Sequence, residues 1–267
     1  MGIVNVTPDS FFPASRTAST NEAIERGRHL FSAGCDIVDV GGESTRPNAQ
    51  FIEPGEELRR VIPVIEALSV HGPVSIDTQK EVVARAAVAA GASVINDVSC
   101  TLIEVAGELG VGYVAMHRQG TAETMQVSPT YEDVVSEIVA FLRVAATRAK
   151  VAGVSKLWLD PGIGFGKTVE HNVALLAHVE TFVSMAQEYG AGVLMGTSRK
   201  RFLESLGKTS LSVDERLEGS IATEAWAMLK GVSMVRVHDA EAAVQLRELL
   251  VRPGQEGVAC GASGQRA

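Results

Sequence analysis

Eight short runs of apolar, mostly β-branched residues recur along the 267-residue chain, and a helix-like stretch follows each of them. This alternation predicts parallel strands joined by helices, because continuous apolar strands are typical of a parallel sheet covered on both faces. Eight such units in roughly 250 residues fit a single α/β domain, a (β/α)8 TIM barrel. A doubly wound open sheet remains the alternative, since periodicity alone does not separate the two. The predicted strands are Gly2–Val6, Ile37–Val40, Val74–Ile76, Val94–Ile95, Gly112–Met116, Leu157–Leu159, Val193–Met195 and Met234–Val237.

Glycines mark the ends of most of the predicted helices. A glycine just after the last helical residue is a common stop signal, because it adopts the left-handed conformation easily. The stop glycines are Gly34, Gly91, Gly110, Gly153, Gly190 and Gly231, and the helices are Asn21–Ala33, Glu56–Leu68, Glu81–Ala90, Ile103–Leu109, Tyr131–Ala152, Asn172–Tyr189, Glu215–Leu229 and Ala240–Leu250. We expect residues 1–251 to form the barrel. Residues 252–267, rich in Gly, Gln, Ser and Ala, are expected to form a flexible tail.

Charge and cysteine content restrict the kind of partner. The chain has 24 Lys and Arg against 32 Asp and Glu, a net charge of −8, which gives no support for a nucleic-acid partner. Three cysteines without a CxxC pair argue against a disulfide scaffold or zinc site and favour a reducing compartment, so we expect a cytoplasmic protein. No apolar run reaches the ~18 residues of a membrane span. We therefore expect neither a nucleic-acid nor a membrane partner.

Polar residues that follow the predicted strands form the candidate site, because the active site of such a barrel lies at the carboxyl ends of its strands. The eighth, first and second strands are neighbours in a closed barrel. Their ends bring together Arg236, His238, Asn5, Thr45 and Arg46. The planar guanidinium of arginine suits phosphate oxygens, so this group predicts an anion site for a phosphate ester or diphosphate.

The remaining strand ends supply Asp77, Asn96, Asp160 and Lys200. Two carboxylates, an amide and an ammonium suit a flat heterocycle, because a carboxylate accepts two parallel N–H bonds. A lone aspartate at a strand end is more often a helix N-cap, which is the alternative for Asp77 and Asp160. Polar residues after nearly every strand exceed what caps require. The segment Gly164–Lys167 lacks the full spacing of a phosphate-binding P-loop.

Seven ordered motifs carry a family resemblance that spans about Gly2 to Leu250. They are Gly2–Phe11 (GIVNVTPDSF), Asp39–Pro47 (DVGGESTRP), Ser75–Thr78 (SIDT), Ile95–Val98 (INDV), Asp160–Lys167 (DPGIGFGK), Thr197–Lys200 (TSRK) and Arg236–Asp239 (RVHD). In sequence and in order they resemble the signatures of the dihydropteroate synthase family, pterin-binding (β/α)8 barrels. The resemblance implies a transferase of folate biosynthesis. Such an enzyme condenses 6-hydroxymethyl-7,8-dihydropterin diphosphate with 4-aminobenzoate to give 7,8-dihydropteroate and pyrophosphate.

The same resemblance implies roles for individual residues, a Mg²⁺ cofactor, sensitivity to sulfonamides and a homodimer. Asn5 is the implied Mg²⁺ ligand, and Asp77, Asp160, Lys200, Arg236 and His238 are the implied catalytic residues. The implied pterin site consists of Asp77, Asn96, Met116, Asp160, Phe165, Gly196 and Lys200. The implied pyrophosphate site consists of Asn5, Thr45, Arg46, Arg236 and His238, and the implied aminobenzoate site of Phe11, Thr45, Pro47, Phe165, Ser198 and Lys200.

Two segments depart from the family pattern. Phe12–Arg16 replaces a small residue followed by Asp-Gly-Gly, so Pro13 stands where an aspartate often helps to hold Mg²⁺, and proline stiffens the loop. Ser99–Thr101 reads Ser-Cys-Thr where Ser-Gly-Gly is common. The first departure leaves a non-catalytic pterin-binding paralogue as an alternative. A methyltetrahydrofolate-binding methyltransferase module is the other alternative, although it would not need Arg46, Arg236 and His238 together.

Overall fold

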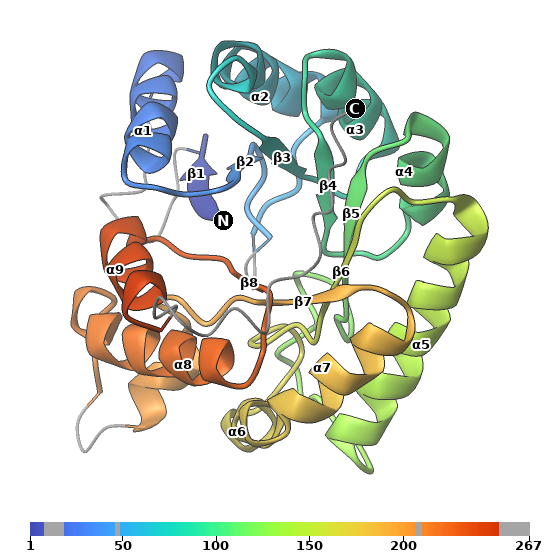
Figure 1. Cartoon of the computed structure of the whole chain (residues 1–267), viewed down its shortest axis with the longest axis vertical. Helices are drawn as coiled ribbons and strands as arrows, with labels where there is room; N and C mark the ends of the chain where they lie inside the picture. The colour runs from blue at the N-terminus through green and yellow to red at the C-terminus, as the bar shows by residue number, and fades with distance from the viewer. Residues whose placement is uncertain (8–18, 46–48, 207–209, 251–267) are drawn as a thin grey trace, which may run out of the picture.

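The computed structural model describes residues 1–7, 19–45, 49–206 and 210–250, and its centre is a sheet of eight parallel strands in chain order (Figure 1). A parallel bridge between Gly2 and Val237 joins the last strand to the first, and the Val237 backbone bonds to Met1 and Ile3 at 2.9 and 3.1 Å. The predicted (β/α)8 barrel is therefore confirmed against the open sheet. Its strands are β1 (Gly2–Asn5), β2 (Val38–Gly41), β3 (Val74–Asp77), β4 (Val94–Asp97), β5 (Gly112–Met116), β6 (Leu157–Asp160), β7 (Gly192–Met195) and β8 (Met234–Val235).

Helices surround the strands on all sides (Figure 1). The predicted helix over residues 172–189 is two helices in the structure, because His178 leaves the helical conformation between them with φ −111° and ψ 26°. A 3₁₀ turn precedes the helix predicted from Glu215. The elements are α1 (Thr20–Ser32), α2 (Pro54–Ser69), α3 (Glu81–Ala89), α4 (Ile103–Leu109), α5 (Val134–Ala152), α6 (Val169–Ala177), α7 (Val179–Glu188), η2 (Arg201–Leu206), η3 (Asp214–Arg216), α8 (Leu217–Leu229) and α9 (Ala240–Leu250).

The glycine stop signals are confirmed by the backbone. All of the predicted stop glycines have positive φ, from +66° at Gly190 to +112° at Gly91. Residues with a side chain rarely adopt this region, whereas glycine does so at little steric cost. The glycines thus end the helices and turn the chain toward the next strand.

The barrel has an apolar interior that changes to a polar layer at the carboxyl ends of its strands. Side chains alternate between the two faces of a strand, so residues two apart point the same way. Met1, Ile37, Val94, Val114, Trp158 and Leu194 form a buried interior cluster separate from the larger core under the helices. The residues two positions further along each chain segment point the same way and lie in the polar layer. They are Asn96 after Val94, Met116 after Val114, Asp160 after Trp158, Gly196 after Leu194 and Arg236 after Met234. The fold thus directs the predicted site residues into the mouth of the barrel.

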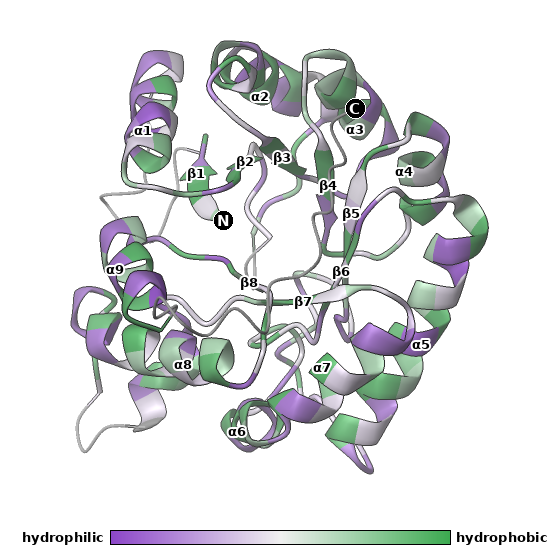
Figure 2. Ribbon diagram, in the orientation of Figure 1, coloured by the Kyte–Doolittle hydropathy of each residue, from purple (hydrophilic) through white to green (hydrophobic). Residues whose placement is uncertain are grey.

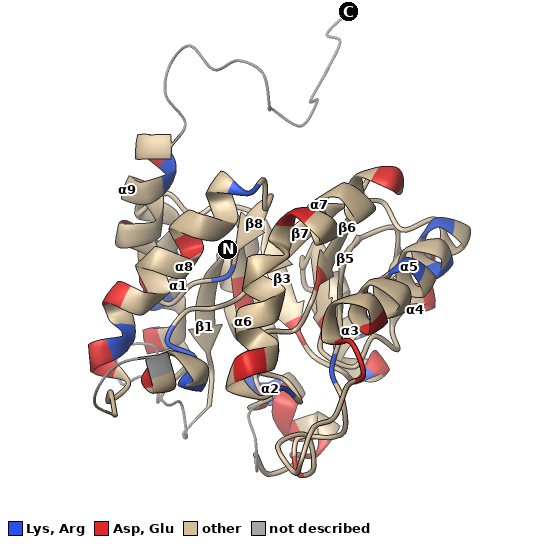
Figure 3. Cartoon of the chain, turned by 90° about the horizontal axis from the view of Figure 1, so that it is seen from below, with Lys and Arg blue, Asp and Glu red and all other residues tan. Residues whose placement is uncertain are grey.

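The helices carry both apolar and polar residues (Figure 2), and charged residues lie mostly on them (Figure 3). This distribution is expected of helices with one face on a barrel and the other in solvent. Within the part of the chain that the structure describes, no helix is long and apolar enough to cross a bilayer.

Candidate active site

One guanidinium lies between two buried carboxylates at the mouth of the barrel. The Arg236 Nε donates to Asp39 Oδ2 at 2.7 Å, and its Nη2 donates to Asp77 Oδ2 at 2.8 Å. The Asn96 amide also donates to Asp39 Oδ2, at 2.9 Å. The Asp39 side chain has no exposed surface and that of Asp77 has 7%. Residues from β2, β3 and β4 and from the end of β8 therefore form one hydrogen-bonded cluster.

This cluster still has hydrogen-bonding capacity for a ligand. Asp39 Oδ1 and Asp77 Oδ1 are buried and have no hydrogen-bond partner among the described residues. A buried acceptor without a donor costs about 1–3 kcal/mol, and more when it is charged. The cluster therefore favours a ligand that brings N–H donors.

Charge in the cluster is unbalanced, because two carboxylates share one guanidinium. Burial raises the pKa of Asp77 to about 7, with Arg236 opposing the rise and the Asp39 charge adding to it. Burial alone would lower the pKa of Arg236, but Asp39 and Asp77 outweigh it and raise that pKa. Arg236 therefore stays charged, and Asp77 holds a proton that it releases near neutral pH.

A second group, from the end of β6 and the loops after β6 and β7, combines an acid, an amine and an aromatic ring. Asp160, at the end of β6, accepts a bond from the Gly162 backbone N–H at 2.7 Å. Lys200 Nζ donates to the carbonyl of Ile163 and lies 4.7 Å from the centroid of the Phe165 ring. Burial raises the pKa of Asp160, which Lys200 opposes, and burial lowers the pKa of Lys200 to about 8, which Asp160 opposes. The charges of Asp160 and Lys200 therefore stabilise each other.

A buried lysine fixes the loop that presents Phe165. Lys167 Nζ donates to the Phe165 carbonyl at 3.0 Å and lies 3.1 Å from Nδ1 of His117. Burial lowers the pKa of Lys167 to about 7 and the pKa of His117 to about 3. His117 is thus a neutral packing residue, its ring edge against Phe141. Lys167 ties the β6–α6 loop to the end of β5.

The backbone of the same loop is fixed at two further glycines. Gly162 has φ +70°, and a Cβ there would collide with the carbonyl oxygen of His117. Gly164 donates its N–H to Asn172 Oδ1 at 2.7 Å and accepts from Gln126 Nε2 at 2.8 Å. Phe165 therefore sits in a loop whose polar groups are held from several elements.

The residues predicted to bind the diphosphate are only partly described. Ser198 Oγ accepts from the His238 backbone N–H at 3.1 Å and lies 3.2 Å from Nδ1 of the same histidine. Asn5 is the last residue of β1, and Thr45 is half-buried in the loop after β2. Phe11, Arg46 and Pro47 lie outside the described residues, as does the Phe12–Arg16 segment.

Two features differ from the sequence-based expectation. Arg236 was expected in an anion group apart from the carboxylates, but its guanidinium pairs with Asp77 of the other group. The capping alternative is wrong for Asp77 and Asp160, because Lys80 and Thr168 occupy the N-cap positions of α3 and α6. An anchoring role does apply to Asp97, which accepts from the backbone N–H groups of Ser99, Thr101 and Leu102 and from the Tyr113 hydroxyl.

Sequence reasoning assigned no role to Asp39 or to Lys167. Asp39 interrupts the apolar run Ile37–Val40, and it is two residues beyond Ile37 of the interior cluster. That spacing places it inside the barrel and could have identified it. Lys167 carried no comparable signal, because nothing in the sequence shows that its ammonium is buried.

The available donors fit a metal that arrives with its substrate. Among residues 1–7, 19–45, 49–206 and 210–250, no group of three or more His, Cys, Asp or Glu could hold an ion. Mg²⁺, however, usually keeps several waters and binds through one or two protein ligands and substrate phosphates. Asn5, the last residue of β1, carries an amide oxygen of the kind that Mg²⁺ accepts, so the donor set suits a diphosphate-bound ion.

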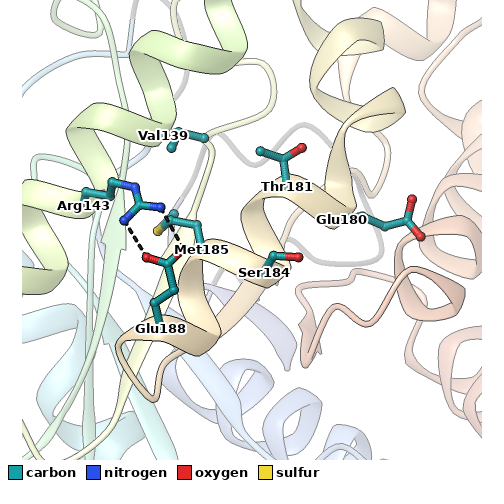
Figure 4. Close-up of a pocket in the computed structure, with 7 residues that line it drawn as sticks. All are labelled: Val139, Arg143, Glu180, Thr181, Ser184, Met185 and Glu188. Carbon is teal, nitrogen blue, oxygen red and sulfur yellow. Dashed lines mark hydrogen bonds and ion pairs between the residues drawn. The ribbon is translucent and has the colours of Figure 1, made fainter.

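A depression of about 410 Å³ between α5 and α7 offers no comparable chemistry (Figure 4). Its Arg143 and Glu188 are paired with each other through two hydrogen bonds of 2.6 and 2.8 Å. Both side chains are exposed, and the depression lies on the outside of the helices. The mouth of the barrel therefore remains the candidate active site.

Comparison with known proteins identifies the family. The family model for "Pterin binding enzyme" matches residues 1–238, and the chain belongs to this family. Dihydropteroate synthase of Escherichia coli K12 is 40% identical over 253 residues, covering 92% of this chain and 88% of that protein. Among solved structures, Yersinia pestis dihydropteroate synthase in a sulfonamide drug complex has a TM-score of 0.85 at 37% identity, covering 92% and 90% of the two chains. Xanthomonas albilineans dihydropteroate synthase with 4-aminobenzoic acid has a TM-score of 0.83 at 42% identity, covering 94% and 93%.

Proposed function

We propose that this chain is an active dihydropteroate synthase, a transferase that joins 6-hydroxymethyl-7,8-dihydropterin diphosphate to 4-aminobenzoate and releases pyrophosphate. The observation that carries this proposal is the cluster at the mouth of the barrel in which Arg236 binds Asp77 and Asp39, and Asp39 binds Asn96. Asp160, at the end of β6, and Lys200, after β7, form the second polar group of the site. The relatives named above support the same reaction.

The pterin ring would lie in the polar layer. A pterin carries an amino group beside a ring N–H, and a carboxylate accepts such a pair of donors in parallel. Asp77, Asn96, Asp160 and Lys200 supply the matching groups. Met116, Phe165 and Gly196 would border the ring. At Gly196 a Cβ would lie 3.7 Å from Lys200 Nζ, so glycine leaves space beside that amine.

The chemical step needs position and charge rather than a covalent nucleophile. The bond between the pterin methylene carbon and the diphosphate oxygen breaks, and the neutral amine of 4-aminobenzoate forms the new C–N bond and then loses a proton. Arg236, His238 and Arg46 would stabilise the negative charge that grows on the leaving diphosphate. Asp77 and Asp160 would stabilise the positive charge left on the pterin.

Two further groups complete the proposed site. Mg²⁺ bound to the diphosphate would withdraw charge from the leaving group, with Asn5 and, in part, Thr45 holding that end of the substrate. Phe165, Ser198 and Lys200 would border the aminobenzoate, together with Phe11 and Pro47 from outside the described residues. Sulfonamides would compete there because they resemble aminobenzoate.

We also propose that the protein is a cytoplasmic homodimer that pairs through its outer helices. Trp226 on α8 is 44% exposed and donates its indole N–H to the Leu176 carbonyl of α6 at 2.8 Å. Val173 on α6 and Leu229 on α8 are also exposed. Exposed apolar groups on adjoining helices are typical of an interface. Light scattering would show a dimer for the wild type and a monomer for Leu229→Glu; a wild-type monomer would contradict the proposal.

The direct test is turnover. Purified protein with Mg²⁺ and both substrates should give 7,8-dihydropteroate and pyrophosphate in equal amounts, measured by mass spectrometry and by a phosphate assay coupled to pyrophosphatase. Arg143→Met, on the outside of α5, is the matched control and should retain the rate. Folded protein that binds the pterin but gives no product would instead identify a non-catalytic paralogue, and restoring Asp-Gly-Gly from position 13 would then show whether the first loop is the cause.

A further inference from the structure

Asp39 is the hydrogen-bonding centre of the cluster, although the resemblance assigns it no role. Its side chain on β2 is fully buried. A single oxygen, Oδ2, accepts both the Arg236 Nε at 2.7 Å and the Asn96 amide at 2.9 Å. Two residues that the proposed reaction uses are therefore fixed by one atom of a third residue.

The two carboxylates that bind Arg236 hold different edges of its guanidinium. Asp39 accepts a hydrogen bond from Nε, the guanidinium nitrogen nearest the backbone, whereas Asp77 accepts one from the terminal Nη2 at 2.8 Å. The Arg236 side chain is 22% exposed, against no exposure for Asp39, so the arginine meets Asp39 at the deep end of the site. A guanidinium donates in fixed directions from Nε and from both Nη atoms, so one edge can change partner while another stays bound.

The proposed reaction favours such an exchange. A pterin that takes both oxygens of Asp77 in parallel competes with Arg236 for Oδ2, and a diphosphate beside Arg236 competes with Asp77 for Nη2. Both interactions weaken the contact between Arg236 and Asp77. Neither requires the contact with Asp39 to break.

We propose that Asp39 is a positioning residue that keeps the Nε edge of Arg236 fixed while its terminal nitrogens pass from Asp77 to the diphosphate. This inference rests on the proposed function. The hydrogen bond from Nε to Asp39 preorganises the guanidinium as a donor. Its terminal nitrogens then stabilise the growing negative charge without a reorientation of the side chain. Asp39 itself need not touch the substrate.

The test is a double-mutant cycle on the full chain. Asp39→Asn keeps the shape but removes the charge that holds Nε, and Arg236→Lys keeps the positive charge but removes Nε. Either change should lower kcat/KM for the pterin diphosphate about 10- to 100-fold, the scale of one hydrogen bond to a charged group. The kcat/KM of the double variant should be no lower than that of the less active single variant, because both substitutions remove the same contact.

One further measurement and one control variant separate positioning from a merely structural role. Calorimetry with 6-hydroxymethyl-7,8-dihydropterin, which lacks the diphosphate, should give a Kd within about threefold of the wild type for Asp39→Asn. Ser75→Ala is the matched control: Ser75 is also buried in the barrel, pairs with Asp39 in the sheet register and has an Oγ without a partner among the described residues. This variant should keep the wild-type kcat/KM.

Several results would overturn the inference. Losses that multiply in the double variant would show that Asp39 acts independently of Arg236, and a large loss of diphosphate-free pterin binding would show direct contact with the ring. If Asp39→Asn does not fold, Arg236→Lys still decides, since near-wild-type activity would show that Nε is not needed. An inactive wild type under the same conditions would refute the proposed function instead.

Discussion

Replacing Arg236 by methionine should destabilise the protein strongly at alkaline pH and much less at acid pH. The substitution leaves Asp39 and Asp77 buried, with 0% and 7% side-chain exposure and no countercharge between them. Removing one partner of a buried ion pair typically costs about 3–5 kcal/mol. For a chain of this size that corresponds to a fall in Tm of roughly 6–20 °C at pH 8.

The pH dependence follows from Asp77. Without the guanidinium the pKa of Asp77 rises further, because Arg236 is the group that opposes burial there. Asp77 then remains protonated in the folded protein at pH 5, and the penalty for burying its charge largely disappears. Each pH unit between the folded and the unfolded pKa of Asp77 relieves about 1.4 kcal/mol.

Thermal unfolding at pH 5 and pH 8 measures this effect directly. Arg143→Met is the matched control, because Arg143 makes an equally well-formed pair with Glu188 whose side chains are 42% and 52% exposed. Such an exposed pair contributes about 0–1 kcal/mol, so its Tm should change little at either pH. Equal destabilisation of Arg236→Met at both pH values, or a loss no larger than that of the control, would refute the buried cluster.

Three further predictions concern single positions. Asp160→Asn should raise the calorimetric Kd for the diphosphate-free pterin about 10- to 100-fold, the value of one charged hydrogen bond, and an unchanged Kd would remove Asp160 from the pterin site. Gly162→Ala should lower the Tm more than Gly153→Ala, since both glycines have positive φ but only the first would place a Cβ against His117, so equal losses would contradict the loop geometry. The Asp77 pKa is raised to about 7 from an ordinary value of 3.8, so the native state holds a proton that the unfolded chain has lost, and stability falls as pH rises from 4 to 7. Denaturant unfolding of Asp77→Asn should show a smaller fall over that window, and parallel curves would refute the shift.

The fold could be predicted because its signals are local. The stop glycines all have the left-handed backbone that the helix ends require. The apolar runs locate the strands, and the number of strand–helix units favours closure. The break at His178 was missed because the residues on both sides of it continue a helical pattern, and only the backbone angles separate α6 from α7.

The site could be predicted only at the level of strand ends. That rule brings Asp77, Asn96 and Asp160 to the mouth of the barrel, since it depends on where each Cα lies. It does not say where a long side chain ends, so Arg236 was expected apart from the carboxylates that it binds. Asp39 was missed for a related reason: it lies inside a strand, one step below the rim.

A structure of the chain with 6-hydroxymethyl-7,8-dihydropterin diphosphate bound is the measurement that tests the central claim most directly. We predict the ring within hydrogen-bonding distance of Asp77, Asn96 and Asp160, with the terminal nitrogens of Arg236 on the diphosphate and its Nε still on Asp39. A ring bound anywhere else, or a diphosphate out of reach of Arg236, would contradict the account.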